Sequence, residues 1–352
     1  MSGSEEFVVL KQLFSSLSEE QKRAFLASVG VQDKAITNVS EKLESAQDFL
    51  LEKRFKNSKP SVCPLCGGSH VIKNGSKDGR QRYLCKDCKK TFGATHNTIL
   101  KASKKDLSVW KKYIHCMIEK YPLRKCAKEC GISLSNAFIW RHKILDALQN
   151  MMDNVTLDGV VEADETFTNI SYKGNHKNFK LPRKAFKRGS KAAKRGLSKE
   201  KVCIPCGINL NGLSISRISN LGKPKWTDIE KVLGGRIQHD SIFVTDSFRG
   251  YQRLSYEMNL NHIRIPRNRH KNGLFNIQLL NSYHAQLKGM INVRFRGVAT
   301  KYLNNYLVYH NLVNFSRGSE EHKETVMLDF TLSTDCVSKS HNVSKRRAIP
   351  IL

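Results

Sequence analysis

The stretch Val160-Val161-Glu162-Ala163-Asp164-Glu165-Thr166-Phe167 decides how the second half of the chain is interpreted. A short β-branched run is followed at once by acidic residues, in a chain with 60 Lys and Arg against 31 Asp and Glu. Side chains alternate between the two faces of a strand, so we expect Glu162 and Asp164 on one face and Glu165 on the other. Carboxylates that share a face repel each other unless a cation lies between them. The stretch alone is equally consistent with a metal site and with a strand end that reaches solvent.

The totals of the chain indicate a multidomain protein with a polyanionic partner. Its 352 residues are enough for two or three domains, and a hydrophobic content of 39% supports a buried core. The net charge of +29 says little about the fold, but it makes nucleic acid the expected partner. The alternative is that the charge belongs to a ribosome-like protein or causes nonspecific binding.

The sequence predicts a protein with no membrane partner. No stretch approaches the roughly 18 uninterrupted apolar residues of a membrane span, and the acidic start Met1-Ser2-Gly3-Ser4-Glu5-Glu6 does not resemble a signal peptide. The ten cysteines are therefore expected in a reducing compartment, as thiols or metal ligands rather than disulfides. We predict a cytoplasmic location, associated with the nucleoid if the source is bacterial.

Two Cys-x-x-Cys knuckles predict a structural zinc site. Cys63 and Cys66 form the first knuckle, and Cys85 and Cys88 form the second, eighteen residues later. Each knuckle offers two thiolates, and a hairpin between them brings the pairs together as a tetrahedron. We therefore predict a zinc ribbon over residues 59–98.

The segments on either side of the predicted ribbon have helical patterns. Residues 1–58 form a helical segment in which no chemistry is visible, and residues 104–150 are predicted as a helix-turn-helix DNA-binding domain. In the second segment, Gly131 supplies the turn and Ser133 caps a second helix. That helix is expected to display four polar side chains to the DNA major groove: Asn136, Arg141, His142 and Lys143. The alternative is an ordinary helix pair with no DNA contact.

From residue 156 the pattern changes to strands alternating with helices. A basic loop between residues 177 and 201 holds eleven Lys or Arg and a single acid, which suggests a mobile arm against a phosphate backbone. A second β run, Ser241 to Ser247, closes on Asp246 and repeats the design of the first. A helix from residue 276 to residue 295 then carries Asn281, His284 and Lys288 on a polar face. Residues 319–352 are predicted to be a flexible tail.

Two strands that each end in Asp, followed by a helix with a polar ligand, are typical of an RNase H-like fold. Phosphodiester attack needs an activated nucleophile and a stabilised leaving oxygen, which two Mg²⁺ ions about 4 Å apart provide together. Hard cations prefer carboxylate oxygens, and a rigid sheet holds those oxygens at a fixed separation. We therefore predict an α+β multidomain chain. Its parts are N-terminal helices, a four-cysteine zinc ribbon, a helix-turn-helix, and an α/β RNase H-like catalytic domain of the DDE integrase type over residues 156–318.

Several motifs, in this order, resemble the ISXO2-like insertion-sequence DDE transposases. Besides the ribbon at 63–93, they are Val161-Glu162-Ala163-Asp164-Glu165-Thr166, Ser198-Lys199-Glu200-Lys201-Val202, Thr245-Asp246-Ser247-Phe248-Arg249-Gly250-Tyr251, Asn281-Ser282-Tyr283-His284-Ala285-Gln286-Leu287-Lys288, Arg296-Gly297-Val298-Ala299-Thr300-Lys301-Tyr302-Leu303 and Asn305-Tyr306-Leu307.

The resemblance implies a set of active-site residues. Asp164 and Asp246 match the two metal-binding aspartates. The third position departs from the Glu of most DDE enzymes, and Asn281 is assigned to it because it precedes Lys288 by seven residues, while His284 stays an alternative. Lys288 would contact phosphate near the cleaved end. An Asn supplies only a neutral oxygen, so we also expect Glu162 or Glu165 to assist in binding the magnesium.

The resemblance further implies DNA transposition, a form of DNA recombination. Such an enzyme binds the terminal inverted repeats of an insertion sequence, cleaves a DNA strand with two Mg²⁺ ions, and transfers the freed 3′-OH into target DNA. Mn²⁺ can substitute for Mg²⁺, and the zinc is structural. The expected partner is double-stranded DNA, both element ends and target, bound by a homodimer or a higher oligomer because two ends must be held together.

Two other functions stay open at this point. One is a non-catalytic zinc-ribbon and helix-turn-helix regulator derived from a transposase, in which the Asn marks a decayed site. The other is a tyrosine recombinase that uses one of the late tyrosines, Tyr302, Tyr306 or Tyr309, as nucleophile. The sequence leaves open which DNA ends and target sites are recognised.

Overall fold

The computed structural model describes residues 62–77, 80–93, 95–101, 103–175, 196–315, 317–333 and 336–351. The chain divides into two compact units, Met1–His96 and Asn97–Leu352, and each is described by itself. The predicted helical segment at 1–58 and most of the predicted basic arm, residues 177–195, lie outside the described residues.

The described part of the first unit is a three-stranded antiparallel ribbon. Its strands are β1 (Val71–Lys77), β2 (Arg80–Cys85) and β3 (Thr91–Gly93), in that order. A small core of Val71, Tyr83 and Phe92 packs beside the knuckle cysteines. So few apolar side chains cannot by themselves stabilise a ribbon of this size, which makes a cross-link through the cysteines necessary.

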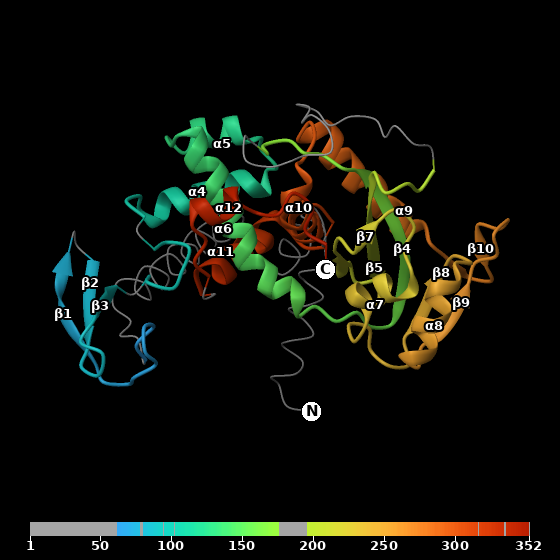
Figure 1. Cartoon of the computed structure of the whole chain (residues 1–352), viewed down its shortest axis with the longest axis horizontal. Helices are drawn as coiled ribbons and strands as arrows, with labels where there is room; N and C mark the ends of the chain where they lie inside the picture. The colour runs from blue at the N-terminus through green and yellow to red at the C-terminus, as the bar shows by residue number, and fades with distance from the viewer. Residues whose placement is uncertain are drawn as a thin grey trace, which may run out of the picture. The chain divides into compact units, whose positions relative to one another are not determined.

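The second unit is organised around a mixed sheet (Figure 1). The strand order is β6-β5-β4-β8-β9, with β7 also paired to β5. The strands β4, β5 and β6 are antiparallel neighbours, whereas β4, β8 and β9 run parallel. Their bounds are β4 Val160–Asn169, β5 Lys201–Asn209, β6 Ser214–Ser216, β7 Asn220–Leu221, β8 Ile242–Thr245 and β9 Asn261–Arg264.

The central strand β4 is longer than its sequence suggested. The prediction that it ends at its acidic residues is wrong, because β4 continues to Asn169. Its extension is held by β5, which pairs with it from Val161 to Asn169. On the other side β8 stops at Thr245, opposite Ala163. The acidic residues of β4 therefore lie where its neighbour ends rather than where β4 itself ends.

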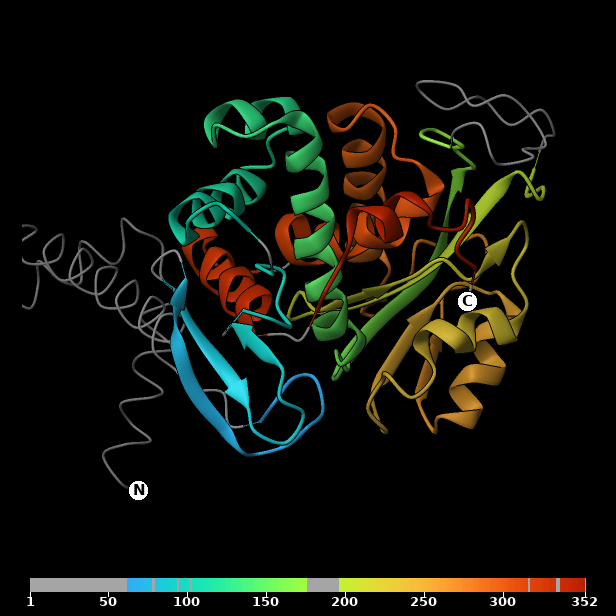
Figure 2. The same cartoon turned by 60° about the vertical axis from the view of Figure 1, so that its left-hand side comes forward.

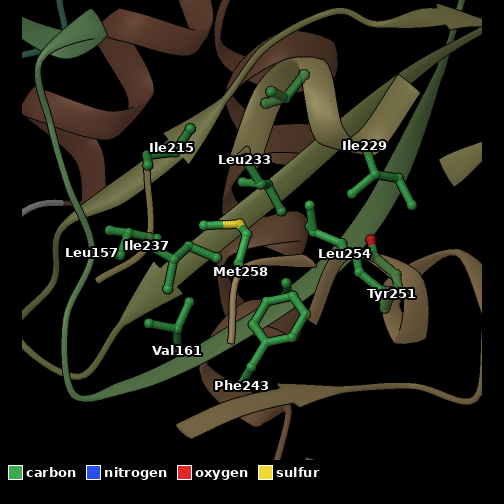
Figure 3. Close-up of a cluster of buried hydrophobic side chains, with 12 residues drawn as sticks. Leu157, Val161, Ile215, Ile229, Leu233, Ile237, Phe243, Tyr251, Leu254 and Met258 are labelled. Carbon is green, nitrogen blue, oxygen red and sulfur yellow. The ribbon is translucent and has the colours of Figure 1, made fainter. Parts of the chain in front are cut away.

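One face of the sheet is covered by α7 (Trp226–Leu233) and α8 (Arg249–Glu257). Figure 3 shows the buried side chains between these helices and the strands, with Val161 of β4 and Phe243 of β8 facing the helices. Ala163 belongs to the same cluster. The alternation predicted for β4 is thereby confirmed for its apolar residues.

The opposite face is covered by helices from the last third of the chain (Figure 2). The helix α9 (Gln278–Gly289) packs on β4 and β5 and continues as the π-helical segment η1 (Met290–Arg294). A small hairpin, β10 (Lys271–Asn272) and β11 (Phe275–Asn276), precedes α9. After η1 follow η2 (Thr300–Tyr302), α10 (Leu303–Tyr309) and the π-helical η3 (His310–Phe315).

The predicted helix pair is present between α5 (Leu123–Glu129) and α6 (Leu134–Asp153), after α4 (Leu107–Ile118). Gly131 has the positive φ of +58° that the turn needs. The Ser133 hydroxyl accepts a hydrogen bond from the Asn136 amide at 3.1 Å and so caps α6.

The prediction that α6 displays Arg141 and His142 to DNA is wrong, because both side chains are buried. The reason is that α6 packs against α5, α10 and α11, so that most of its surface is core. His142 packs on the rings of Phe138 and Tyr302, and burial lowers its pKa to about 3. Among the described side chains of α6, the exposed ones lie in its first turn, Leu134 to Asn136, and at its last residue, Asp153.

The prediction of a flexible tail at 319–352 is also wrong. The segment contains α11 (Glu320–Ser333) and α12 (Ser340–Ser344), and α11 packs on α4 and α6. Arg346 donates two hydrogen bonds to the Asp146 carboxylate on α6, at 2.6 and 2.7 Å. These long-range contacts could not be predicted from the sequence, because the segment is mostly polar. None of the helices in the described part of the chain has the length and apolar character that a membrane crossing requires.

Candidate functional site

The two predicted metal-binding aspartates lie side by side at the end of β8. Ala163 of β4 pairs with Thr245 of β8 in parallel register, so Asp164 and Asp246 are the next residues of adjacent strands. At Asp246 the chain leaves the sheet, and its Oδ1 accepts a hydrogen bond from the Phe248 amide at 2.9 Å. That bond leaves the remaining lone pairs of the Asp246 carboxylate available to a ligand.

The surroundings of Asp164 disfavour its charged form. Burial and, to a smaller extent, the negative charges of Glu165 and Asp246 together raise the pKa of its carboxyl to about 8, whereas Lys288 opposes the shift. Burial also raises the pKa of Glu165. Buried carboxyls that lie beside other negative charges favour a bound cation, so the surroundings of Asp164 have the electrostatics of a cation site.

Glu165 points to the opposite face of β4 from Asp164. Its Oε2 accepts a hydrogen bond from the Tyr251 hydroxyl of α8 at 2.9 Å. Tyr251 is itself fully buried in the core cluster (Figure 3). Glu165 is therefore fixed in place by α8 while it remains close enough to Asp246 to feel its charge.

Glu162 is buried and its carboxylate is engaged by a helix. Its Oε2 accepts a hydrogen bond from the Leu280 amide at 2.9 Å. Burial raises the pKa of Glu162, and the amides of Leu280 and Leu279 oppose that shift. These amides belong to the first turn of α9, where backbone N–H groups have no partner within the helix. Glu162 thus anchors α9 to β4.

The polar residues predicted on α9 have different surroundings. Asn281 and Lys288 are exposed, whereas His284 is 8% exposed. Burial and then the charge of Lys288 lower the pKa of His284 to about 4, and its Nε2 has no hydrogen-bond partner among the described residues. Of the three, Lys288 acts electrostatically on Asp164. Neither Asn281 nor His284 is hydrogen-bonded to an aspartate of the site in the described part of the chain.

The four knuckle cysteines have the geometry of a zinc site. Their Sγ atoms all lie within 4.8 Å of one another, with 3.8 Å between Cys63 and Cys88 and 3.6 Å between Cys66 and Cys85. Zinc–sulfur bonds of about 2.3 Å in a tetrahedron place the sulfurs about 3.8 Å apart, so the residues fit the ion. Within the residues that the structure describes, no other group of three or more His, Cys, Asp or Glu ligand atoms converges in this way.

The hydrogen-bond partners of Glu165 and Glu162 could not be predicted from the sequence. Tyr251 lies five residues after Asp246 in the same motif, but nothing in that spacing shows that it binds Glu165. The Leu280 amide carries no sequence signal at all. The candidate tyrosine nucleophiles are buried, since Tyr302 and Tyr306 are below 10% exposed and Tyr309 is fully enclosed. That burial makes them unsuited to attack a DNA phosphate.

Comparisons with known proteins match two parts of the chain. The model of the ISXO2-like transposase domain matches residues 156–309, and the model of the transposase zinc-ribbon domain matches residues 43–91. A relative described as an uncharacterized protein in transposable element ISH50, from Halobacterium salinarum, is 31% identical over 143 residues. The match covers 40% of this chain and 47% of that protein, about half of its length.

Two solved structures are also similar. A pre-cleavage Mos1 transpososome is 10% identical, with 66% of this chain and 78% of that chain covered and a TM-score of 0.26. A simian T-cell lymphotropic virus intasome in complex with the PP2A regulatory subunit B56 gamma is 10% identical, with 56% and 58% covered and a TM-score of 0.24. At these scores neither structure bears on the fold or the function.

The resemblance to the ISXO2-like transposases is thereby confirmed by the two domain models, which match in the order that the motifs predicted. Asp164, Asp246, Asn281 and Lys288 all lie inside the matched transposase domain. The chain carries an ISXO2-like transposase domain over residues 156–309, preceded by a transposase zinc ribbon.

Proposed function

We propose that the chain is a DNA transposase that binds the terminal inverted repeats of an insertion sequence, cleaves a DNA strand there and transfers the 3′-OH into target DNA. The observation that carries the proposal is the placement of Asp164 on β4 and of Asp246 directly after the adjacent parallel strand β8, within a matched transposase domain. Lys288, on the helix above, supplies a positive charge beside Asp164.

The strand order supports an RNase H-like domain. Three antiparallel strands, β6, β5 and β4, are extended by two parallel strands, β8 and β9. The first strand of the domain in chain order, β4, is the central strand of the sheet. Its parallel neighbour is β8. Both supply an acidic residue to one site.

The residues fit a pair of Mg²⁺ ions, with Mn²⁺ as substitute. Carboxylate oxygens are the ligands these cations prefer, and burial together with the charges of Glu165 and Asp246 raises the pKa of Asp164, which a bound cation would reverse. When bound, the cations supply activation of the attacking oxygen and stabilisation of the leaving oxygen. Asp164 and Asp246 would hold the ions and Lys288 would bind a phosphate near the cleaved end, while Tyr251 orients Glu165 through its hydroxyl.

Asn281 completes the site in this proposal, with His284 as the competing residue. Asn281 is exposed on the first turn of α9, and Glu162 fixes that turn against β4 through the Leu280 amide. His284 is directed into the protein and is almost fully buried. Glu162 therefore assists by positioning α9, which differs from the direct cofactor contact expected from its sequence position.

Double-stranded DNA is the proposed partner of two parts of the chain that precede the catalytic domain. The net charge of +29 favours a polyanion. The zinc ribbon and the α5–α6 pair are proposed to grip the inverted repeats. Within α6 the exposed first turn, Leu134 to Asn136, is the part that we propose enters a groove. A dimer or larger assembly follows from the need to hold two ends.

The test is strand cleavage of inverted-repeat DNA in Mg²⁺. We expect Asp164→Asn and Asp246→Asn to abolish cleavage while the affinity for the end DNA stays within about twofold. Exposed Asp240→Asn, on the turn before β8, is the matched control and should cleave as the unaltered chain does. Residual cleavage by either active-site variant would contradict the assignment.

The alternative is a non-catalytic regulator, favoured by one observation. The third position is a neutral Asn on an exposed turn, which gives a weaker cation site than Glu would. The same assay separates the two functions, since a regulator binds the end DNA but does not nick it in Mg²⁺ or Mn²⁺. Asn281→Glu should then raise cleavage or cation affinity if the site is active.

A further inference from the structure

A large groove lies in the second unit, away from the paired aspartates. Its volume is about 1510 Å³, above the roughly 300–1,000 Å³ of a small-molecule pocket. It lies between the start of the α5–α6 pair, the end of β4 and the segment that follows η1. Among its lining residues are Arg124, Phe138, Arg141, Arg294, Phe295 and Arg296.

The charge of the groove has a single sign. Its lining includes Arg124, Lys173, Arg294 and Arg296, and it includes no Asp or Glu. The side chains of Arg124, Arg294 and Arg296 are exposed, so their charges are available to a ligand. Mixed charges are the usual composition of a protein surface, and a wall of one sign attracts a counter-charged partner.

Arg141 adds a buried charge beneath the groove. It is 1% exposed, and its Nη2 donates to the Tyr121 carbonyl at 2.7 Å and to the Cys126 sulfur at 3.3 Å. Its Nε and Nη1 have no hydrogen-bond partner, and no carboxylate pairs with it among the described residues. Buried charges are normally paired, so this guanidinium favours an anion in the groove above it.

Two half-buried aromatic rings line the same groove. Phe295 is supported from behind by the Arg141 guanidinium, at 5.4 Å, and by the edges of Tyr306 and Tyr309. Phe138 is supported by His142 and Tyr302 at ring distances of 4.6 and 5.4 Å. Rings fixed in this way are suited to stack against planar groups at little entropic cost.

The wall of the groove is fixed before any ligand binds. Lys301 is buried, and its Nζ donates to the carbonyls of Gly174 at 2.8 Å and Ser344 at 3.3 Å. Lys173 donates to the Gly297 carbonyl at 3.2 Å. These bonds join the end of β4 to the segment after η1 and to α12, so the groove is a preformed site.

We infer that this groove binds an unpaired stretch of DNA strand, with phosphates on Arg124, Arg294 and Arg296 and bases against Phe138 and Phe295. The inference rests on the proposed function and names a second contact of the same substrate. Aromatic stacking requires exposed base faces, which a duplex hides in its stack. The volume suits several nucleotides rather than one small molecule.

The test measures binding of a fluorescein-labelled oligodeoxythymidine of about ten nucleotides, a length within the usual single-strand site size. Phe138→Leu and Phe295→Leu keep the apolar packing but remove the stacking face, and each should weaken binding about tenfold without changing its salt dependence. Arg124→Gln/Arg294→Gln should weaken binding and lower the slope of log affinity against log salt by about 1.4, since each contact contributes about 0.7.

The matched control is Arg269→Gln/Lys271→Gln, which removes two exposed charges near the β10–β11 hairpin, outside the groove. It should change single-strand affinity by less than twofold. Equal competition by a duplex of the same length overturns the inference, as does unchanged binding by both Phe variants with native thermal melting. Groove binding by a chain that never cleaves end DNA would refute the proposed function and leave the binding inference standing. Cleavage of end DNA without single-strand binding would refute the binding inference and leave the proposed function standing.

Discussion

At the scale of single residues, Asp164 illustrates how a partly buried carboxyl beside other acidic residues opposes stability. Its carboxyl is half-buried beside two other acids, and its pKa is raised to about 8 from an ordinary value of 3.8. The folded chain therefore binds a proton that the unfolded chain has released at neutral pH. A raised acid pKa gives stability that is complete below the unfolded pKa and is lost as pH rises through the folded one.

From this linkage we predict that Asp164→Asn stabilises the metal-free second unit at pH 8 and that the gain disappears near pH 4. Each kcal/mol shifts the melting temperature of a domain of this size by roughly 2–4 °C, so a gain of several degrees is expected. Thermal melting in a chelator between pH 4 and pH 8 measures it. Asp240→Asn is the control, and a gain that does not depend on pH would contradict proton uptake by Asp164 as its cause.

The identity of the paired aspartates could be predicted from sequence, but their partners could not. Period-two alternation and the repeat of a β run before Asp246 were enough to select Asp164. The roles of Tyr251 and the Leu280 amide depend on contacts made across 86 and 118 residues of chain. Such contacts leave no local pattern, because the two ends of each are chosen by the packing of separate elements.

At the scale of elements, the attachment of α9 to β4 is the decisive contact. The Glu162 carboxylate accepts from the first turn of α9, which carries Asn281 one residue beyond Leu280. A carboxylate at a helix N-terminus satisfies an unpaired N–H group and interacts favourably with the helix dipole. Glu162 thus fixes the first turn of α9, and with it the backbone of Asn281, against β4.

We predict that Glu162→Ala lowers the free energy of unfolding by about 1–2 kcal/mol, the range for loss of a helix-capping acceptor. Hydrogen exchange at the Leu280 amide should become faster, whereas Glu162→Gln, which keeps an acceptor oxygen, should lose about half as much. Glu165→Gln serves as control because its side chain binds α8. An unchanged Leu280 exchange rate in Glu162→Ala would show that the hydrogen bond does not hold α9.

The sequence predicts which segments are helices or strands better than it predicts what those helices and strands pack against. The turn at Gly131 and the alternation of strands and helices from residue 156 follow from turn residues and periodicity, and the structure confirms both. The burial of Arg141 in α6 could not be predicted, because it depends on α10 and α11, which lie far along the chain. A polar residue on a helix was assumed to face water, and tertiary packing overrode that assumption.

At the scale of the whole molecule, the two compact units depend on different sources of stability. The ribbon has a core of a few side chains and four clustered thiols, whereas the second unit has a continuous core on both faces of its sheet. The metal is therefore expected to contribute most of the folding free energy of the ribbon.

We predict that a zinc chelator unfolds residues 63–93 and leaves the melting of the second unit unchanged. Cys66→Ser should have the same effect without chelator, while Cys203→Ser, a buried thiol in β5, serves as a control outside the ribbon. Amide NMR of the ribbon, with thermal melting of the rest, measures the difference. Loss of both units together would show that they are energetically coupled.

The packing of α11 and Arg346 onto the early helices also constrains when these helices can finish folding during synthesis. Asp146 and Arg346 are separated by 200 residues, and α4 and α6 bury their apolar faces against α10 and α11. At a synthesis rate of about 5–20 residues per second, α6 waits roughly 10–40 s for these partners. The early helices therefore leave the ribosome with uncovered apolar faces. A product ending before residue 303 would keep them uncovered, and would be a substrate for chaperones and proteases rather than a working short form.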